Sequence, residues 1–111
     1  MSINPDIELV KHILDETEFI LNHTKHLSRE AYISDEVLCR ASIRSLEVIG
    51  EAAKKLTDDF KNKHPSIEWR KIAGTRDKLI HDYYGIDYDI VWDILTSKIQ
   101  ELHNYLKKLR W

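Results

Sequence analysis

The stretch DEVLCRASIRSLEVIGEAAKKLTDDFKN, residues 35–62, carries apolar and small side chains at spacings of three and four from end to end. This period is typical of an α-helix that buries one face. The buried stripe is predicted to contain Leu38, Ala41, Ser45, Leu46, Ile49, Ala52, Ala53, Leu56 and Phe60. Gly50 lies inside this helix, although glycine costs roughly 1 kcal/mol relative to alanine there. Together with the small residues of the stripe, it indicates that another backbone or a ligand comes close.

The residues before this stretch predict a first helix and a connector. Asn4 is a good N-cap and Pro5 suits the first helical position, so a helix is expected from there to about residue 26. The segment LSREAYIS, residues 27–34, is typical of a connector. Ser34 is followed by two acids and is predicted to cap the long helix.

The segment KNKHPS after the long helix breaks the chain at Pro65, and two more helices are predicted beyond it. The third should cover residues 66–84 and end at Gly85 in a left-handed conformation. Asp87 is predicted to cap the fourth, over residues 88–109. Because no strand pattern lies between them, the expected fold is all-α, a four- to five-helix antiparallel bundle around one core.

The composition is typical of one globular domain over residues 1–111, since 42% of the residues are apolar and 32% are charged. No apolar run approaches the ~18 residues that a membrane span needs. The acidic N-terminus does not resemble a signal peptide, so we expect a cytoplasmic protein without a membrane partner. The single Cys39 fits a reducing compartment, and we expect it to be a small buried residue and not a nucleophile.

The charge is unevenly distributed along a chain whose net charge is -2. Residues 54–78 hold 8 Lys and Arg against 4 Asp and Glu, whereas residues 1–53 hold 5 against 10. A basic segment in an acidic protein can attract phosphate through its local field. A solvated helix end is the alternative explanation.

The stretch GTRDKLIHDYYG, residues 74–85, places charged residues among core-like ones. On a helical wheel at about 100° per residue, Arg76 falls in the middle of an apolar arc. The arc contains Trp69, Ile72, Ala73, Leu79, Ile80, Tyr83 and Tyr84. An unpaired buried guanidinium is costly, so Arg76 must meet a carboxylate, a phosphate or a hydrated interface. An ion pair with Glu47 or Glu51 is the structural alternative to a functional site.

A histidine and an arginine together are sufficient for RNA cleavage without a metal. His81 could transfer a proton to or from the ribose 2′-hydroxyl or the leaving oxygen, and Arg76 could stabilise the charge on the phosphate. Each such contribution is typically ~100-fold or more. By default, however, a lone histidine is a surface residue, and Tyr83 and Tyr84 would be packing aromatics.

Competing sites are weak. His23 and His26 have a metal-compatible spacing, but no third ligand is evident, so a solvated helix end is favoured and no metal or other cofactor is expected. The chain also has no glycine-rich phosphate loop, nucleophile elbow or paired-cysteine motif.

The segment RDKLIHDYYGID, residues 76–87, resembles the R-x4-H-x-Y signature of HepT-like toxins in the HEPN superfamily. The similarity extends over roughly residues 36–105 and includes the polar residue Asp77 directly after the arginine. It implies a HEPN-type bundle that forms a homodimer, with Arg76 and His81 of both copies at one cleft. Because burial of Arg76 is costly, we also expect the face with Trp69, Ile72, Arg76, Ile80 and Tyr83 to be at least partly intersubunit.

The resemblance also implies an activity, a partner and a modification. The activity is that of a metal-independent endoribonuclease with RNA as substrate, acting as the toxin of a type VII-like toxin–antitoxin module. The partner is a minimal nucleotidyltransferase antitoxin that transfers AMP to Tyr83. The residues expected to support the site as a whole are Asp77, Glu51 and Tyr84. Either tyrosine hydroxyl could be the accessible one, and the partner could instead act by docking. The alternative function is a non-catalytic HEPN module that binds a nucleotidyltransferase or a nucleotide.

Overall fold

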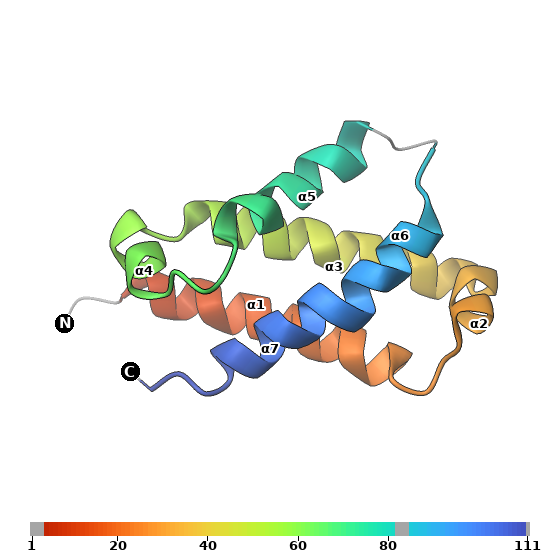
Figure 1. The fold of residues 1–111 in the computed structure, drawn as a ribbon, viewed down its shortest axis with the longest axis horizontal. Helices are drawn as coiled ribbons and strands as arrows, with labels where there is room; N and C mark the ends of the chain where they lie inside the picture. The colour runs from red at the N-terminus through yellow and green to blue at the C-terminus, as the bar shows by residue number, and fades with distance from the viewer. Residues whose placement is uncertain (1–3, 82–84, 111) are drawn as a thin grey trace.

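Four antiparallel helical rods, joined at their ends by two short helices, make up the described part of the molecule (Figure 1). The computed structural model describes residues 4–81 and 85–110, except for the side chains of Arg76, Leu79, Ile80 and His81. The short helices are α2 (Arg29–Ser34) and α4 (Asp58–Lys63). The rods are α1 (Pro5–Thr24), α3 (Glu36–Lys55), α5 (Trp69–His81) and a continuous rod of α6 (Tyr88–Asp93), a π-helical turn η1 (Ile94–Lys98) and α7 (Ile99–Leu106). The predicted all-α bundle is confirmed, and the described residues contain no strand.

One core joins these rods. α3 packs along α1 on one side and along α5 on the other, and α1 also contacts η1 and α7. The largest fully buried apolar side chains are Tyr32, Ile13, Ile20, Ile49, Leu95, Leu102 and Leu106. None of the helices in the described ranges combines the length and apolar character that crossing a membrane would require.

The segment predicted as a connector contains a helix, α2. Ser28 caps it by accepting a hydrogen bond from the backbone N–H of Ala31 at 3.1 Å. Tyr32 is fully buried and its hydroxyl is 2.6 Å from Ser42 Oγ of α3. Ser34 is the last residue of α2, so the predicted cap of α3 is wrong: Asp35 Oδ1 accepts the bond from Leu38 N at 3.0 Å.

The long helix predicted over residues 35–62 is broken in two. α3 ends at Lys55, and Thr57 caps α4 by accepting a hydrogen bond from Phe60 N at 3.1 Å. The break is held by Asp6 of α1, whose carboxylate accepts bonds from Thr57 N at 2.9 Å and Thr57 Oγ1 at 2.6 Å. Phe60 still reaches the core, as predicted, but from α4.

α5 begins three residues later than the predicted residue 66. Its first residue, Trp69, is buried within the chain: its indole N–H donates to His64 O at 3.0 Å, and its ring lies 5.7 Å from that of Phe60. The expectation that Trp69 contributes to an intersubunit face is therefore wrong. The predicted cap at Gly85 depends on residues 82–84, which lie outside the described residues.

The last rod starts as predicted, at Asp87, whose Oδ1 accepts a bond from Asp89 N at 2.9 Å. Its regular course is interrupted by η1, which the apolar spacing explains. Val91, Leu95 and Ile99 are four residues apart, and each such step drifts about 40° around a regular α-helix. The wider π-helical turn absorbs this drift, and all three side chains are buried.

Candidate active site

The residues of the R-x4-H motif lie in the C-terminal half of α5, which packs lengthwise on α3. Arg76 and His81 are five positions apart, so the helix separates their backbone positions by a rise of about 7.5 Å and a rotation of about 140°. The structure therefore places the two residues on one helix but not on one stripe. Tyr83 and Tyr84 lie outside the described residues, as do the side chains of Arg76 and His81.

The predicted supporting residues lie on two helices. Asp77 is exposed on α5. Glu51 on α3 is 3.8 Å from Lys55 Nζ, and Glu47 is 3.7 Å from Arg44 Nη1. Both glutamates line a hollow of about 340 Å³ between α1 and α3. Each candidate carboxylate for Arg76 therefore already has a cationic neighbour on its own helix.

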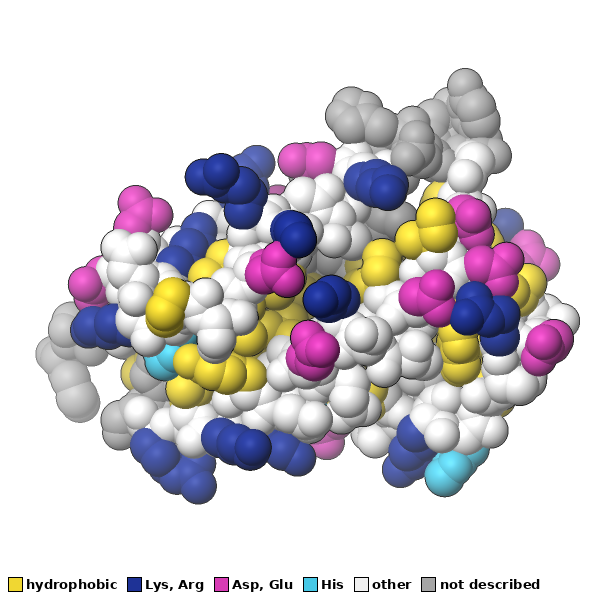
Figure 2. Space-filling model, in the orientation of Figure 1, with side chains coloured by type: hydrophobic (Ala, Val, Ile, Leu, Met, Phe, Trp, Pro, Cys, Tyr) yellow, Lys and Arg dark blue, Asp and Glu magenta, His cyan; other side chains and the backbone are white. Residues whose placement is uncertain are grey.

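A groove separates α5 from the rod that contains α6, η1 and α7 (Figure 2). Beside the motif end of α5, a hollow of about 320 Å³ lies between Thr75 and Lys78 on one side and apolar residues of α6 and η1 on the other. Further along, a depression of about 170 Å³ opens over Leu46 and Ile49 of α3. Figure 2 shows this hydrophobic floor between charged side chains.

The cations around the groove are partly neutralised. Glu68 is 2.7 Å from Lys71 Nζ and 3.7 Å from Lys98 Nζ, so it bridges α5 and η1. The hydrogen bond from Lys71 holds the pKa of Glu68 below its usual value. Among the described residues, Arg70 and Lys78 are exposed on α5 without an ion-pair partner. The remaining positive charge of the basic segment thus includes cations on the motif helix itself.

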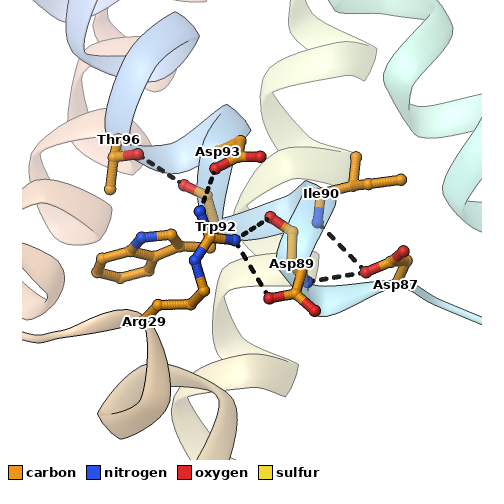
Figure 3. Close-up of polar contacts among 7 residues, drawn as sticks. All are labelled: Arg29, Asp87, Asp89, Ile90, Trp92, Asp93 and Thr96. Carbon is orange, nitrogen blue, oxygen red and sulfur yellow. Dashed lines mark hydrogen bonds and ion pairs between the residues drawn. The ribbon is translucent and has the colours of Figure 1, made fainter.

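A polar brace, which the sequence patterns did not predict, joins α2 to α6 (Figure 3). Arg29 Nη1 donates to the backbone carbonyl of Asp89 at 3.1 Å and to its carboxylate at 3.2 Å. Arg29 Nη2 donates to Asp93 Oδ1 at 2.8 Å. The available signal was Ser28, a good N-cap followed by an acid in the first turn, which would have marked α2 as a helix. The partners of Arg29 lie 60 and 64 positions further along the chain, so the apolar periodicity could not reveal them.

The other reactive side chains have structural surroundings. Cys39 is buried, its thiol donates to Tyr32 O at 3.2 Å, and burial raises its pKa, so the expected small buried residue is confirmed. His23 donates through Nδ1 to Phe19 O at 2.8 Å at the end of α1. In the ranges that the structure describes, no three His, Cys, Asp or Glu side chains are grouped so as to hold a metal ion.

Comparison with known proteins decides the family. A profile described as "Ribonuclease HepT-like" matches residues 13–109, which is most of the chain. The chain belongs to the ribonuclease HepT-like family. This HepT-like chain is 46% identical over 100 residues to a candidate RNase of Caldanaerobacter subterraneus, a match that covers 90% of this chain and 89% of the relative.

Two further relatives of the HepT-like chain support the assignment. A protein of Thermococcus cleftensis named "Probable ribonuclease HepT" is 39% identical over 103 residues, covering 93% of this chain and 94% of the relative. A candidate RNase of Methanocaldococcus jannaschii is 43% identical over 101 residues, covering 87% and 84%. No solved structure matches the chain.

Proposed function

We propose that this HepT-like chain, as a single HEPN domain over residues 1–111, is a metal-independent endoribonuclease and the toxin of a two-gene toxin–antitoxin module. The observation that carries the proposal is the position of Arg76 and His81 in the C-terminal half of α5, in a chain of a ribonuclease family. Exposed Arg70 and Lys78 on the same helix support it, because unpaired cations attract the phosphates of RNA.

The proposed reaction needs only groups of this chain and of RNA. His81 takes the proton of a ribose 2′-hydroxyl, whose oxygen attacks the adjacent phosphorus as the bond to the 5′-oxygen of the next nucleotide breaks. That leaving oxygen receives a proton from a second imidazole, supplied by the other copy of the chain. Arg76 binds the non-bridging phosphate oxygens and stabilises the charge in the transition state. The products are a 2′,3′-cyclic phosphate and a free 5′-hydroxyl.

The activity is tested by incubating the purified protein with total RNA in EDTA and sequencing the fragment ends. Wild type should cleave, and His81→Ala should lower the rate at least about 100-fold with unchanged helical content. His26→Ala is the matched control, because His26 is exposed at the end of α1 and outside the motif. Cleavage by His81→Ala at the wild-type rate would remove the general acid–base assignment. Binding of RNA without cleavage by wild type would favour the non-catalytic module.

Arg76 is tested by charge-conserving substitution. Arg76→Lys should also lose about 100-fold in rate, because an ammonium does not reproduce bidentate contacts to phosphate. Arg70→Lys, on the same helix and exposed, should cleave like wild type. Equal activity of Arg76→Lys would show that positive charge alone is required at this position.

We further propose that a nucleotidyltransferase partner neutralises the toxin by transferring AMP to Tyr83. Tyr83 follows His81 by two residues, so an added adenylyl group would bring bulk and a phosphate into the reach of the Arg76 site. That phosphate would occupy the position meant for the RNA phosphate.

Peptide mass spectrometry after incubation with the partner and ATP tests the modification. We expect one adenylyl group on wild type and on Tyr84→Phe, and none on Tyr83→Phe, which should stay toxic in the presence of the partner. An unmodified Tyr83 in a neutralised complex would mean that the partner acts by docking.

A further inference from the structure

The first turn of α6 is held from both of its sides. Asp87 caps it from within the chain, with 2.9 Å between its carboxylate and Asp89 N. Arg29 of α2 holds the same turn through the carbonyl and the carboxylate of Asp89 and, one turn later, through Asp93 (Figure 3). The bond to the carbonyl acts on the backbone itself, so it fixes the helix whatever rotamers the aspartates adopt. The planar guanidinium allows all three contacts at once.

α2 is in turn fixed on the core. The fully buried Tyr32 bonds to Ser42 of α3, and its ring centroid lies 5.2 Å from that of Trp92 and 6.3 Å from that of Tyr88. Arg29 therefore projects from a packed helix and not from a free loop. Through α2, the position of α6 is tied to α3.

α6 is also the helix that receives the chain after the motif. The described part of α5 ends at His81, and Gly85 begins the stretch that leads through the half-buried Ile86 to α6. The four residue steps from His81 to Gly85 span at most roughly 14 Å when fully extended. The hollow of about 320 Å³ lies between Thr75 and Lys78 of α5 and the apolar residues of α6 and η1, so the position of α6 sets the width of the groove beside the motif. α5 packs directly on α3, and α6 is tied to α3 through α2. α3 therefore positions both the helix before the motif's end and the helix after it.

We propose that Arg29 is a positioning residue for the ribonuclease site. It fixes α6, and with it the spacing of the two helices that flank the motif, without contacting RNA. The inference rests on the proposed ribonuclease function and adds to it a residue that lies outside the motif. The positioning role requires the forked guanidinium of Arg29, since one ammonium cannot bind the Asp89 carbonyl and the Asp93 carboxylate in the same geometry.

The test compares Arg29→Gln and Arg29→Lys with a matched control, Arg40→Gln. Arg40 also makes an exposed arginine–carboxylate pair, at 2.9 Å to Glu36, but within one helix. In single-turnover cleavage with saturating enzyme, both Arg29 variants should be at least about tenfold slower than wild type, since small misplacements of reacting groups are costly. Their affinity for RNA should stay within about twofold of wild type, because Arg29 does not touch the substrate. Arg40→Gln should cleave at the wild-type rate.

Two further measurements separate positioning from a general loss of stability. Hydrogen–deuterium exchange should become faster in α6 of Arg29→Gln while the amides of α1 and α3 keep their protection. Asp93→Asn should reproduce the slow cleavage, and the double variant Arg29→Gln/Asp93→Asn should be no slower than the slower single variant, because both changes break one contact.

The outcomes are distinct. Cleavage by Arg29→Gln at the wild-type rate, or a full rescue by Arg29→Lys, overturns the positioning role while the ribonuclease function stands. Faster exchange in all helices of Arg29→Gln overturns it as well, because the residue would then act on overall stability. A wild-type protein that leaves RNA intact contradicts the proposed function and removes the positioning role with it.

Discussion

Thr17 and His103 form a polar contact between α1 and α7 within the core. Thr17 is fully buried, and its hydroxyl oxygen lies 3.1 Å from Leu14 O and 2.8 Å from His103 Nδ1. Burial, followed by the charge of Lys107, lowers the pKa of His103 below its ordinary value of 6.5.

The lowered pKa of His103 predicts a loss of stability in mild acid. The unfolded chain, with the ordinary pKa of 6.5, takes up the proton at a higher pH than the folded chain does. The free energy of unfolding should therefore fall as the pH is lowered through 6.5 towards the folded pKa, and fall no further from this cause below it. Urea unfolding at several pH values between neutral and mildly acidic measures the slope.

The matched variants are His103→Gln and His26→Gln. The first keeps a side chain that can either donate to or accept from Thr17 but cannot titrate, so its free energy of unfolding should depend less on pH than that of wild type. The second alters an exposed histidine at the end of α1 and should retain the wild-type slope. Equal slopes for wild type and His103→Gln would show that other groups cause the acid dependence.

Among the secondary-structure elements, the π-helical turn gives the sharpest prediction. Deleting exposed Thr96 from η1 should convert the turn to regular α-helix, because Leu95 and Ile99 would then be three residues apart and still on one face. The shortened chain should fold with a similar melting temperature. Deleting exposed Gln100 instead should rotate Leu102 and Leu106 by about 100° away from the core and abolish cooperative melting. Two equally stable deletions would mean that η1 does not compensate for the spacing.

The elements also show where sequence patterns stop being informative. The caps at Asn4 and Asp87 were predicted because each depends on a contact two residues away. The break after α3 was not, because Asp6 reaches Thr57 across 51 positions. The N-cap at Ser28 is a local signal for α2, whereas the contact that buries Tyr32 against Ser42 of α3 is tertiary and has no signature in the apolar period.

The same limit applies to the candidate site. The apolar period correctly placed Arg76 and His81 on a helix, and the motif with its surroundings indicated the family. The helical wheel places Trp69 on the face expected to be partly intersubunit, but it could not reveal that Phe60 and His64 of the preceding segment cover this side chain. Nor could the period reveal the groove, which depends on how far α5 lies from α7.

At the scale of the whole molecule, we expect a homodimer that brings two copies of α5 to one hydrated cleft. The physical reason is the cost of placing the Arg76 guanidinium in an apolar arc, which a water-filled two-fold interface reduces. Light scattering at micromolar concentration should give twice the chain mass of 13.2 kDa. Arg70→Glu, an exposed change on α5, should leave this mass unchanged if Arg70 lies outside the interface. A monomeric wild type would contradict the shared cleft and the second imidazole of the proposed reaction.

The groove beside α5 also bears on the order in which the protein comes apart. α1 packs against both α3 and α7. α5 packs against α3 and borders the groove on its other side. A segment that packs extensively on one helix and borders a groove elsewhere can open at lower free energy than the global transition. On gentle heating α5 should therefore detach while α1, α3 and α7 still hold together. The protein would then be inactivated at a temperature where most of its helical signal persists, losing its function before its fold.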